Sequence, residues 1–409
     1  MDRTLKNRST ETENKSGKFV AVILIALLYI ALLVLDNLKM APASSMGKTI
    51  SMLIPVLRKG AIYALLCVSM NLLNGFTGLF SLGQAGFMLI GAYTYAIFSI
   101  PVEAHASVYQ YFDGGSIQFS IPEALPHVLG NTAGNFLGAI LCILLAGCVT
   151  AVFAALIGIP CLRFKSDYLA IATLGFAEII RAFFMWDGLG KITNGSNLLR
   201  KYVAFSDMKL VLGDTTVKFG TAFVFLIAML CIIFILLLIN SSYGRAYKAI
   251  RDDEIAAEAM GINLFKHKMQ AFIISSFFAG VGGALLAMYQ TTVQAAPFKS
   301  AMTYEILLMV VIGGIGSVSG SCIAAFLYIA CNEWWLRFLD SGSLFGLVDV
   351  PFFRDGFRKV VFSVIIMVIV LFFSHGIMGD KELTFKGMRE RRQKRKAAKA
   401  AKAEGGERE

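Results

Sequence analysis

YGRAYKAIRDDEIAAEAMGI, at Tyr243–Ile262, is the most charged run in the middle of an otherwise apolar chain. The apolar run Phe219–Ile239 precedes it, and the apolar run Met269–Met288 follows it. Each apolar run has about the 20 residues that a helix needs to cross the ~30 Å hydrocarbon core of a bilayer. The charged run is therefore expected to be a loop between two membrane spans.

This loop is rich in Ala, Glu, Arg, Lys and Met, which all favour helices. Ile250, Ile255, Ala259 and Ile262 can share one apolar face of such a helix, and Gly261 is placed to end it. A short helix at a membrane surface that carries both signs of charge is predicted to be a docking element. The alternative is an ordinary solvated loop that happens to be helical.

The composition of the 409 residues is that of a polytopic membrane protein, because 57% are hydrophobic and 16% are charged. Soluble domains have about 25% charged residues. The net charge of +11 lies mostly at the two ends, as expected for segments on the cytoplasmic side, and it does not indicate nucleic acid binding. The seven cysteines form no CxxC pair and have no histidine at metal spacing, which predicts reduced, packed thiols.

The apolar runs predict an all-α bundle of about ten membrane spans, with short or broken helices and both termini in the cytoplasm. A polar head (1–18) precedes the transmembrane domain (19–375), and a basic tail (376–409) that is predicted to lie against anionic lipid follows it. The first run, 19–35, is predicted to be an uncleaved span, although Ala41-Pro42-Ala43 resembles a signal-peptide cleavage site. The other spans are predicted at 52–73, 85–100, 136–159, 168–186, 219–239, 269–288, 301–336 (two crossings with a turn at the glycines) and 357–373.

Two glycine-rich segments interrupt this pattern, one in 74–84 and one in 313–317. So many glycines allow either a helix break or a close approach of two backbones. Irregular backbone at membrane depth is tolerated only inside protein or beside a water-filled cavity. We therefore predict that these segments line a pathway, with tight helix–helix contact as the alternative. The candidate residues are Asn74, Gly75, Thr77, Gly78, Ser81, Gly83, Gln84, Gly313, Gly314 and Gly316.

Other polar and small residues also lie within predicted spans. Glu178 and Arg181 are spaced i, i+3, so they can pair on one helix face or extend toward an interface. Ser276, Gly280 and Ala284 recur every four residues, which is typical of close helix packing in membranes.

Catalytic motifs are absent from the sequence: it contains no Walker A motif, no G-x-S-x-G and no H-E-x-x-H. The chain is therefore not expected to be an enzyme or to bind a metal or cofactor. Active transport by this chain would require an ion gradient or a separate ATPase.

Four stretches resemble the LivM type of the LivHM permease family, which serves bacterial branched-chain amino acid ABC importers. They are NLLNGFTGLFSLGQAGF at 71–87, DYLAIATLGFAEIIR at 167–181, GRAYKAIRDDEIAAEAMGI at 244–262 and VIGGIGS at 311–317. The third is similar to the family's ATPase-coupling loop. The general importer pattern E-A-A-x-x-x-G is degenerate here, since Gly261 lies seven residues after Glu254 and three after Glu258.

The resemblance implies a permease in the bacterial inner membrane that pairs with a LivH-type sister permease and with two ATPase subunits that bind the ATP. It also implies that residues 243–262 are a cytoplasmic coupling helix. The implied ATPase contacts are Arg251, Asp252, Asp253, Glu254, Glu258 and Gly261.

The resemblance further implies that outer loops 101–135 and 188–218 receive a substrate-loaded extracytoplasmic binding protein. The candidate contacts Thr193, Asn194, Gly195 and Ser196 resemble a family segment there. Related importers carry urea, short amides, other amino acids or nucleosides, so the substrate stays open. An ion-coupled secondary transporter that works alone and a membrane scaffold are the alternatives from other classes.

Overall fold

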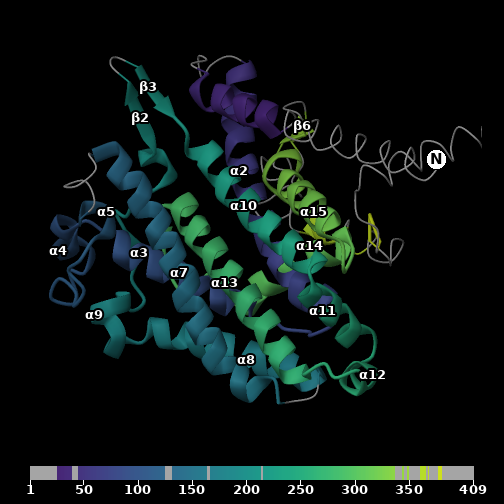
Figure 1. The fold of residues 1–409 in the computed structure, drawn as a ribbon. Helices are drawn as coiled ribbons and strands as arrows, with labels where there is room; N and C mark the ends of the chain where they lie inside the picture. Colours follow the sequence, from purple (N-terminus) through teal and green to yellow (C-terminus); the bar gives the residue numbers. More distant parts are fainter. Residues whose placement is uncertain are drawn as a thin grey trace, which may run out of the picture.

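The protein is a bundle of helices in the computed structural model, which describes residues 25–38, 45–124, 131–163, 166–212, 215–336, 343–344, 348–349, 360–364, 367 and 376–379 (Figure 1). The longer helices are α2 (Ser45–Asn71), α3 (Gln84–Ser99), α7 (Asn131–Cys161), α8 (Ser166–Met185), α10 (Gly220–Asn240) and α13 (Leu264–Gln290). Shorter helices include a helix at Ile25–Asn37, α11 (Ser242–Asp252), α14 (Ser300–Gly313) and α15 (Val318–Ala330). The prediction of an all-α membrane bundle is confirmed.

Strands are few and short in the described part of the chain. β1 (Leu199–Arg200) pairs with β4 (Thr292–Val293), β2 (Lys209–Leu212) pairs with β3 (Thr215–Lys218), and β5 (Ser343–Leu344) pairs with β6 (Val348–Asp349). All three pairs are antiparallel, and each lies outside the long helices. The β1–β4 pair also contributes to the core, because Leu199 and Val293 are buried in the hydrophobic cluster.

Five described helices are long and apolar enough to cross a membrane, or six if the pair Gln84–Ser99 and Val102–Val108, which bends by 103°, is one span. Each predicted span from 19–35 to 301–336 contains a helix, whereas 357–373 lies mostly outside the described residues. The run 301–336 divides into α14 and α15 at the glycines, as predicted. The head 1–18 and most of the tail 376–409 also lie outside the described residues, so the location of the termini stays a prediction.

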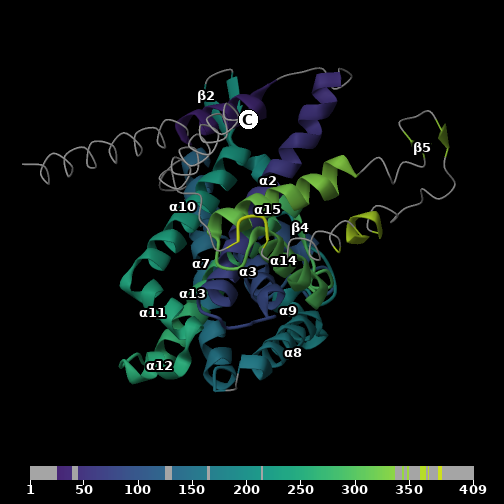
Figure 2. The ribbon, with the colours of Figure 1, turned by 90° about the vertical axis from the view of Figure 1, so that its right-hand side faces the viewer.

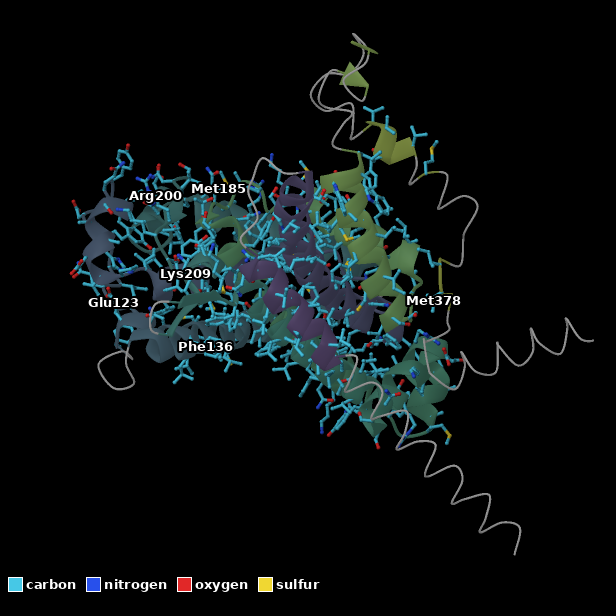
Figure 3. The ribbon with its side chains drawn as sticks, turned by 90° about the horizontal axis from the view of Figure 1, so that it is seen from above. Glu123, Phe136, Met185, Arg200, Lys209 and Met378 are labelled. Carbon is cyan, nitrogen blue, oxygen red and sulfur yellow. The ribbon has the colours of Figure 1, made fainter. Side chains whose placement is uncertain are left out.

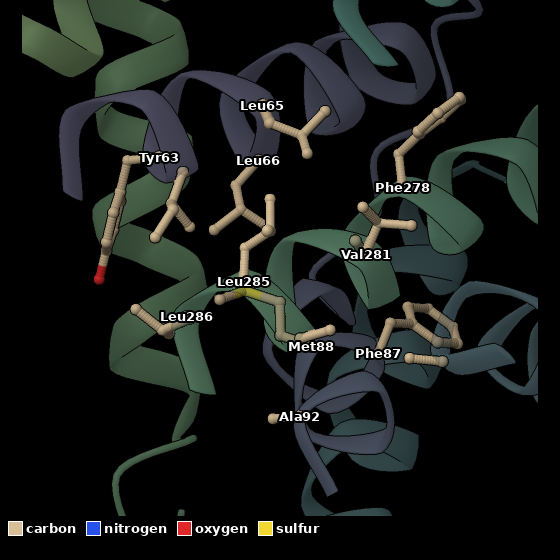
Figure 4. Close-up of a cluster of buried hydrophobic side chains, with 14 of the residues drawn as sticks. Tyr63, Leu65, Leu66, Phe87, Met88, Ala92, Phe278, Val281, Leu285 and Leu286 are labelled. Atoms are coloured by element: carbon tan, nitrogen blue, oxygen red, sulfur yellow. The ribbon is translucent and has the colours of Figure 1, made fainter. Parts of the chain in front are cut away.

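Helix α13 is the centre of the bundle, since 83% of its apolar stretch is buried, whereas only 28% of the apolar stretch of α8 is buried. The small residues predicted to pack it closely, Ser276, Gly280 and Ala284, are all buried, and Gly283, which was not predicted, also makes a close contact. A Cβ on Gly91 of α3 would overlap Gly280 of α13, and a Cβ on Gly283 would overlap the carbonyl of Met88. Around these contacts, side chains of α2, α3 and α13 form the hydrophobic cluster in Figure 4. Removing this apolar surface from water or lipid and packing it densely fixes the three helices relative to one another.

The helix Ile25–Asn37 is tied to the body of the bundle by the carboxylate of Asp36, whose side chain is only 2% exposed. Its oxygens accept hydrogen bonds from the backbone N–H of Thr221 at 2.8 Å and from the Thr221 hydroxyl at 2.7 Å. Arg58 of α2 lies 3.2 Å from the same carboxylate. A buried carboxylate needs such partners, so this helix is an integral part of the fold.

Two connections predicted to be outer loops pack against each other to form what we name the loop platform, residues 101–124 and 186–212. The amide of Asn194 donates to the carbonyl of Val108 at 3.1 Å, and the Tyr109 hydroxyl donates to the carbonyl of Ile192 at 2.9 Å. The platform includes α4 (His105–Val108), α5 (Ile121–Ala124) and α9 (Gly190–Thr193). Seen from above, Glu123 and Arg200 of the platform lie toward one side of the molecule and Met378 toward the other (Figure 3).

Candidate functional site

The charged run 243–262 forms two helices, α11 and the short α12 (Glu254–Ala259), where one was predicted. Asp253 breaks the run, with extended backbone at φ −159° and ψ 113°. Its carboxylate accepts hydrogen bonds from the backbone N–H groups of Ile255 at 2.8 Å and Ala256 at 3.0 Å. The side chain therefore caps α12, which offsets the loss of helical continuity. Gly261, at φ 84°, follows the end of α12 as predicted.

The single apolar face predicted for this run is wrong, because the break at Asp253 reorients α12. Ile250 is buried, whereas Ile255 is 82% exposed. Met260 is 83% exposed, and Ala257 is the buried residue of α12. Helix α12 lies at the edge of the bundle, at the opposite end from β2 (Figures 1 and 2). The segment therefore has an exposed apolar tip, formed by Ile255 and Met260.

Helix α11 packs onto the bundle through the buried Tyr247 and Ile250. Burial raises the pKa of Tyr247 to about 12. Lys248 extends over the ring of Phe76, with its Nζ 5.7 Å from the ring centroid. Helix α11 is thus a packed element, while α12 is an exposed one.

Arg251, near the end of α11, contacts the first glycine segment directly. Its Nη1 donates a hydrogen bond to the carbonyl of Gly75 at 3.2 Å. A Cβ on Gly78 would lie 3.0 Å from the Arg251 Cγ, and Gly78 has a positive φ of 74° that disfavours any side chain. The same guanidinium pairs with Asp252 at 3.0 Å. Arg251 therefore connects α11 to the irregular segment that follows α2.

The two predicted glycine segments meet at what we name the glycine junction, residues 71–84 and 313–321. After α2 the chain forms a π-helical turn, Leu72–Phe76, and then irregular backbone to Gln84. The amide of Asn71 donates to Ser317 O at 3.0 Å and to Ser321 Oγ at 2.8 Å, and its oxygen accepts from Gly316 N at 2.8 Å. A Cβ on Gly75 would lie 2.6 Å from Gly316 N, so only glycine allows this approach.

The remaining pathway candidates hydrogen-bond within the junction or with helices beside it. Asn74 accepts from Ser81 N at 3.2 Å, and Gln84 donates to Ser69 Oγ at 2.8 Å. The other pairs are Thr77 Oγ1 with Leu72 O, and Gly83 N with Ser81 Oγ. Gly313 packs against Gly320, and Gly314, at φ 112°, lies beside Gly379. These contacts establish close backbone approach, while the lining of a pathway stays a prediction.

The candidate contacts for a binding protein lie at the end of α9, on the loop platform. Thr193, Asn194 and Gly195 are buried in this chain, and Ser196 is exposed. Asn194 has a left-handed backbone at φ 62°, and its amide bonds stabilise the loop from inside. The exposed surface around these residues consists of Lys191, Ile192, Ser196, Leu198 and Arg200.

A family model described as "Branched-chain amino acid transport system / permease component" matches residues 52–374. The chain belongs to this permease family. It is 33% identical over 293 residues to the "High-affinity branched-chain amino acid transport system permease protein LivM" of Salmonella typhimurium, and 32% identical to that of Escherichia coli. Each alignment covers 66% of this chain and 61% of the relative, so the chain matches about three fifths of each relative's length.

The chain is also similar to an archaeal member of this permease family that has a LivH name. The "Probable branched-chain amino acid transport permease protein LivH" of Methanocaldococcus jannaschii is 27% identical over 222 residues, which is 52% of this chain and 64% of the relative. No solved structure matches the chain. Among the described residues, no group of three or more His, Cys, Asp or Glu could hold a metal ion.

Sequence reasoning about this member of the permease family did not predict that Asn71, Ser317 and Ser321 join the two glycine segments. Asn71 is fully buried, and its three hydrogen bonds reach residues about 245 positions away. One signal was present, because an amide side chain next to an apolar helix end needs partners. The sequence does not say which partners those are.

Proposed function

We propose that the chain is one of two membrane permease subunits of an ABC importer for branched-chain amino acids in the bacterial plasma membrane. The family match and the names of the LivM relatives support the transport class and the substrate. The similarity to a LivH-named protein supports pairing with a sister permease of related sequence. Each permease would contribute half of the translocation pathway.

In this proposal the chain binds no ATP or cofactor of its own, and two separate ATPase subunits supply the work. The exposed tip of α12 docks on one of them, and α11 transmits the displacement to the glycine junction. The observation that carries this assignment is that one part of the charged run is exposed while the other part packs against the bundle. Ile255 and Met260 are more than four-fifths exposed, while Arg251 lies against Gly75 and Gly78.

At the opposite end, the loop platform would receive the substrate-loaded binding protein, with both termini in the cytoplasm. The exposed Ser196 and its neighbours Lys191 and Arg200 offer polar and basic contacts for that partner. The buried Thr193, Asn194 and Gly195 would act by holding the loop in shape.

The docking role is tested by placing charge on the tip in the double variant Ile255→Glu, Met260→Glu. Both side chains are exposed, so the fold tolerates the change, whereas charge reversal at Asp253 would also remove the cap of α12. We expect the variant to insert normally but to lose both co-purification of the ATPase subunits and leucine uptake in cells. The matched control is Tyr111→Glu, which changes a 69% exposed residue of the platform and should keep the ATPases bound.

Normal leucine uptake by the double variant would refute docking through α12. Uptake driven by the purified chain alone in vesicles, without ATPase subunits, would favour an ion-coupled secondary transporter instead. Competition of leucine uptake by urea, amides or nucleosides distinguishes the substrates that related importers carry.

A further inference from the structure

The outward faces of two long helices are continuously apolar, as lipid contact requires. On α7 the exposed large residues are Leu137, Leu141, Leu144, Val152, Phe153, Leu156 and Ile159. On α10 they are Leu230, Ile233, Phe234 and Leu237. No acidic or basic side chain lies within Gly134–Cys161 or Gly220–Asn240. These two faces suit the hydrocarbon of a bilayer.

Helix α8 differs, because it carries an ion pair at membrane depth in a partly open position. Arg181 Nη2 lies 2.7 Å from Glu178 Oε2, with the two side chains 24% and 36% exposed. This confirms the predicted i, i+3 pair. By helical rise, Glu178 lies roughly 15 Å from the Tyr168 end of the span and roughly 10 Å from the Met185 end. Arg181 lies roughly 6 Å from the Met185 end by the same rise. The pair is therefore within the span, nearer to its Met185 end.

The pair lies in the crease between α8 and the short helix α14. The other Glu178 oxygen accepts hydrogen bonds from Ser300 N at 3.2 Å and from Ser300 Oγ at 3.1 Å. Tyr304, one turn further along α14, is 48% exposed. On α8, a Cβ on Gly175 would have no atom within 4 Å, so open space lies one turn from Glu178. Figure 2 shows α8 at the edge of the bundle.

Lipid is a poor cover for this surface. A charged pair taken out of water is stabilised only when hydrogen bonds satisfy its remaining polar atoms, and hydrocarbon offers none. Ionisable residues in spans accordingly face protein or a water-filled cavity. The partly exposed Glu178 and Arg181 indicate that a polar surface covers this face, whereas the apolar faces of α7 and α10 can contact lipid directly.

We propose that the α8–α14 face, formed by Ile171, Gly175, Glu178, Arg181, Ser300 and Tyr304, is covered by the second permease subunit, with the ion pair in a polar seam between the two. This rests on the proposed function, in which the chain pairs with a sister permease. The 27% identity of this chain to a LivH-named protein supports a partner of related sequence. Two related chains can then present equivalent helices across an approximate two-fold axis.

Photo-crosslinking within the assembled transporter tests the proposal. The photoreactive residue benzoylphenylalanine replaces Tyr304 or, as a second position, Ile171, which is 68% exposed and two turns from Glu178. The matched controls replace the exposed aromatic residues Phe153 of α7 and Phe234 of α10. The probes are introduced into the chain co-expressed with its sister permease, and crosslinked products in the membrane are identified by mass spectrometry.

We expect crosslinks to the sister permease from positions 304 and 171, and crosslinks to lipid alone from positions 153 and 234. The proposal is overturned if positions 304 and 171 crosslink only lipid, or only a second copy of this chain, or if the sister permease is captured from the control positions instead. Co-purification of the unmodified permeases is measured alongside. A pair that does not form refutes the proposed heterodimer, whereas a pair that forms without crosslinks at 304 and 171 refutes the face alone.

Discussion

Replacing Arg251 by methionine should uncouple ATP hydrolysis from solute uptake. The methionine retains an apolar stem of similar length on α11, so packing over Gly78 is largely kept. The variant loses the hydrogen bond from Nη1 to the carbonyl of Gly75 and the charge beside Gly316. It also loses the exposed ion pair with Asp252, which is expected to contribute little because solvent screens it. We name α11 and α12 together the arm. In the proposed mechanism this hydrogen bond links the arm directly to the glycine junction.

The size of the effect follows from the geometry. A hydrogen bond from a charged donor contributes about 1.5–3 kcal/mol when it is well shielded. Here the distance is 3.2 Å and the arginine side chain is 38% exposed, so solvent screens the interaction. A contribution of about 1 kcal/mol is the reasonable value, which corresponds to roughly a five-fold shift in the equilibrium between the docked and undocked arm. We expect the number of leucine molecules imported per ATP to fall by a similar factor.

The assay measures leucine uptake and ATP hydrolysis in vesicles that contain the complete transporter. The matched control is Arg245→Met on the same helix, since the guanidinium of Arg245 donates a hydrogen bond to Ser242 of its own helix, at 2.9 Å. ATP hydrolysis should persist in both variants, and only Arg251→Met should lower the uptake per ATP. An equal ratio in the two variants would refute the link through Arg251, whatever the absolute rates.

Three predictions concern the bundle and are read from thermal unfolding of the detergent-purified chain. Gly283→Leu should prevent folding or destabilise the chain by about 3 kcal/mol or more, because a side chain there overlaps the Met88 backbone, whereas Gly175→Ala should be tolerated. Asn71→Leu should cost about 1–3 kcal/mol by leaving buried partners unbonded, and Asn240→Leu, at an exposed position, should cost little. Asp36→Ala should lower stability by about 2 kcal/mol and loosen the helix Ile25–Asn37. An unchanged unfolding temperature in any of the three would contradict the corresponding contact.

Hydropathy alone predicted where most helices lie, because the length of an apolar run is set by bilayer thickness. The bias of basic residues toward the cytoplasmic side predicted that 301–336 divides at its glycines, because two crossings place both basic ends on that side. The small residues of α13 were informative for the same reason, because a helix with Gly280 and Gly283 can approach Gly91 and Met88.

The arrangement of the candidate site was not predictable in this way. Helix propensity and capping have similar magnitudes, about 1 kcal/mol each, so the sequence around Asp253 does not decide between one helix and two. The contact of Asn71 with Ser317 joins residues 246 positions apart, and no local pattern encodes it. Local rules therefore located each glycine segment, while only the tertiary structure shows that the two segments meet through Asn71 and that Arg251 contacts them.

The connections of α12 indicate where the bundle can change shape. Helix α12 follows α11 directly after Asp253, whose side chain caps α12. Glu254 of α12 pairs with Lys268, near the start of α13, at 2.6 Å. A push on the tip thus reaches both α11 and α13. Along α13, backbone contacts with α3 leave no room for sliding, so those helices must move together. At the glycine junction, Gly78, Gly314 and Gly316 have positive φ values, and backbone without side chains can adopt other angles at little cost. We therefore expect the displacement of the arm to bend the chain at the junction while the core of α3 and α13 moves as a rigid body.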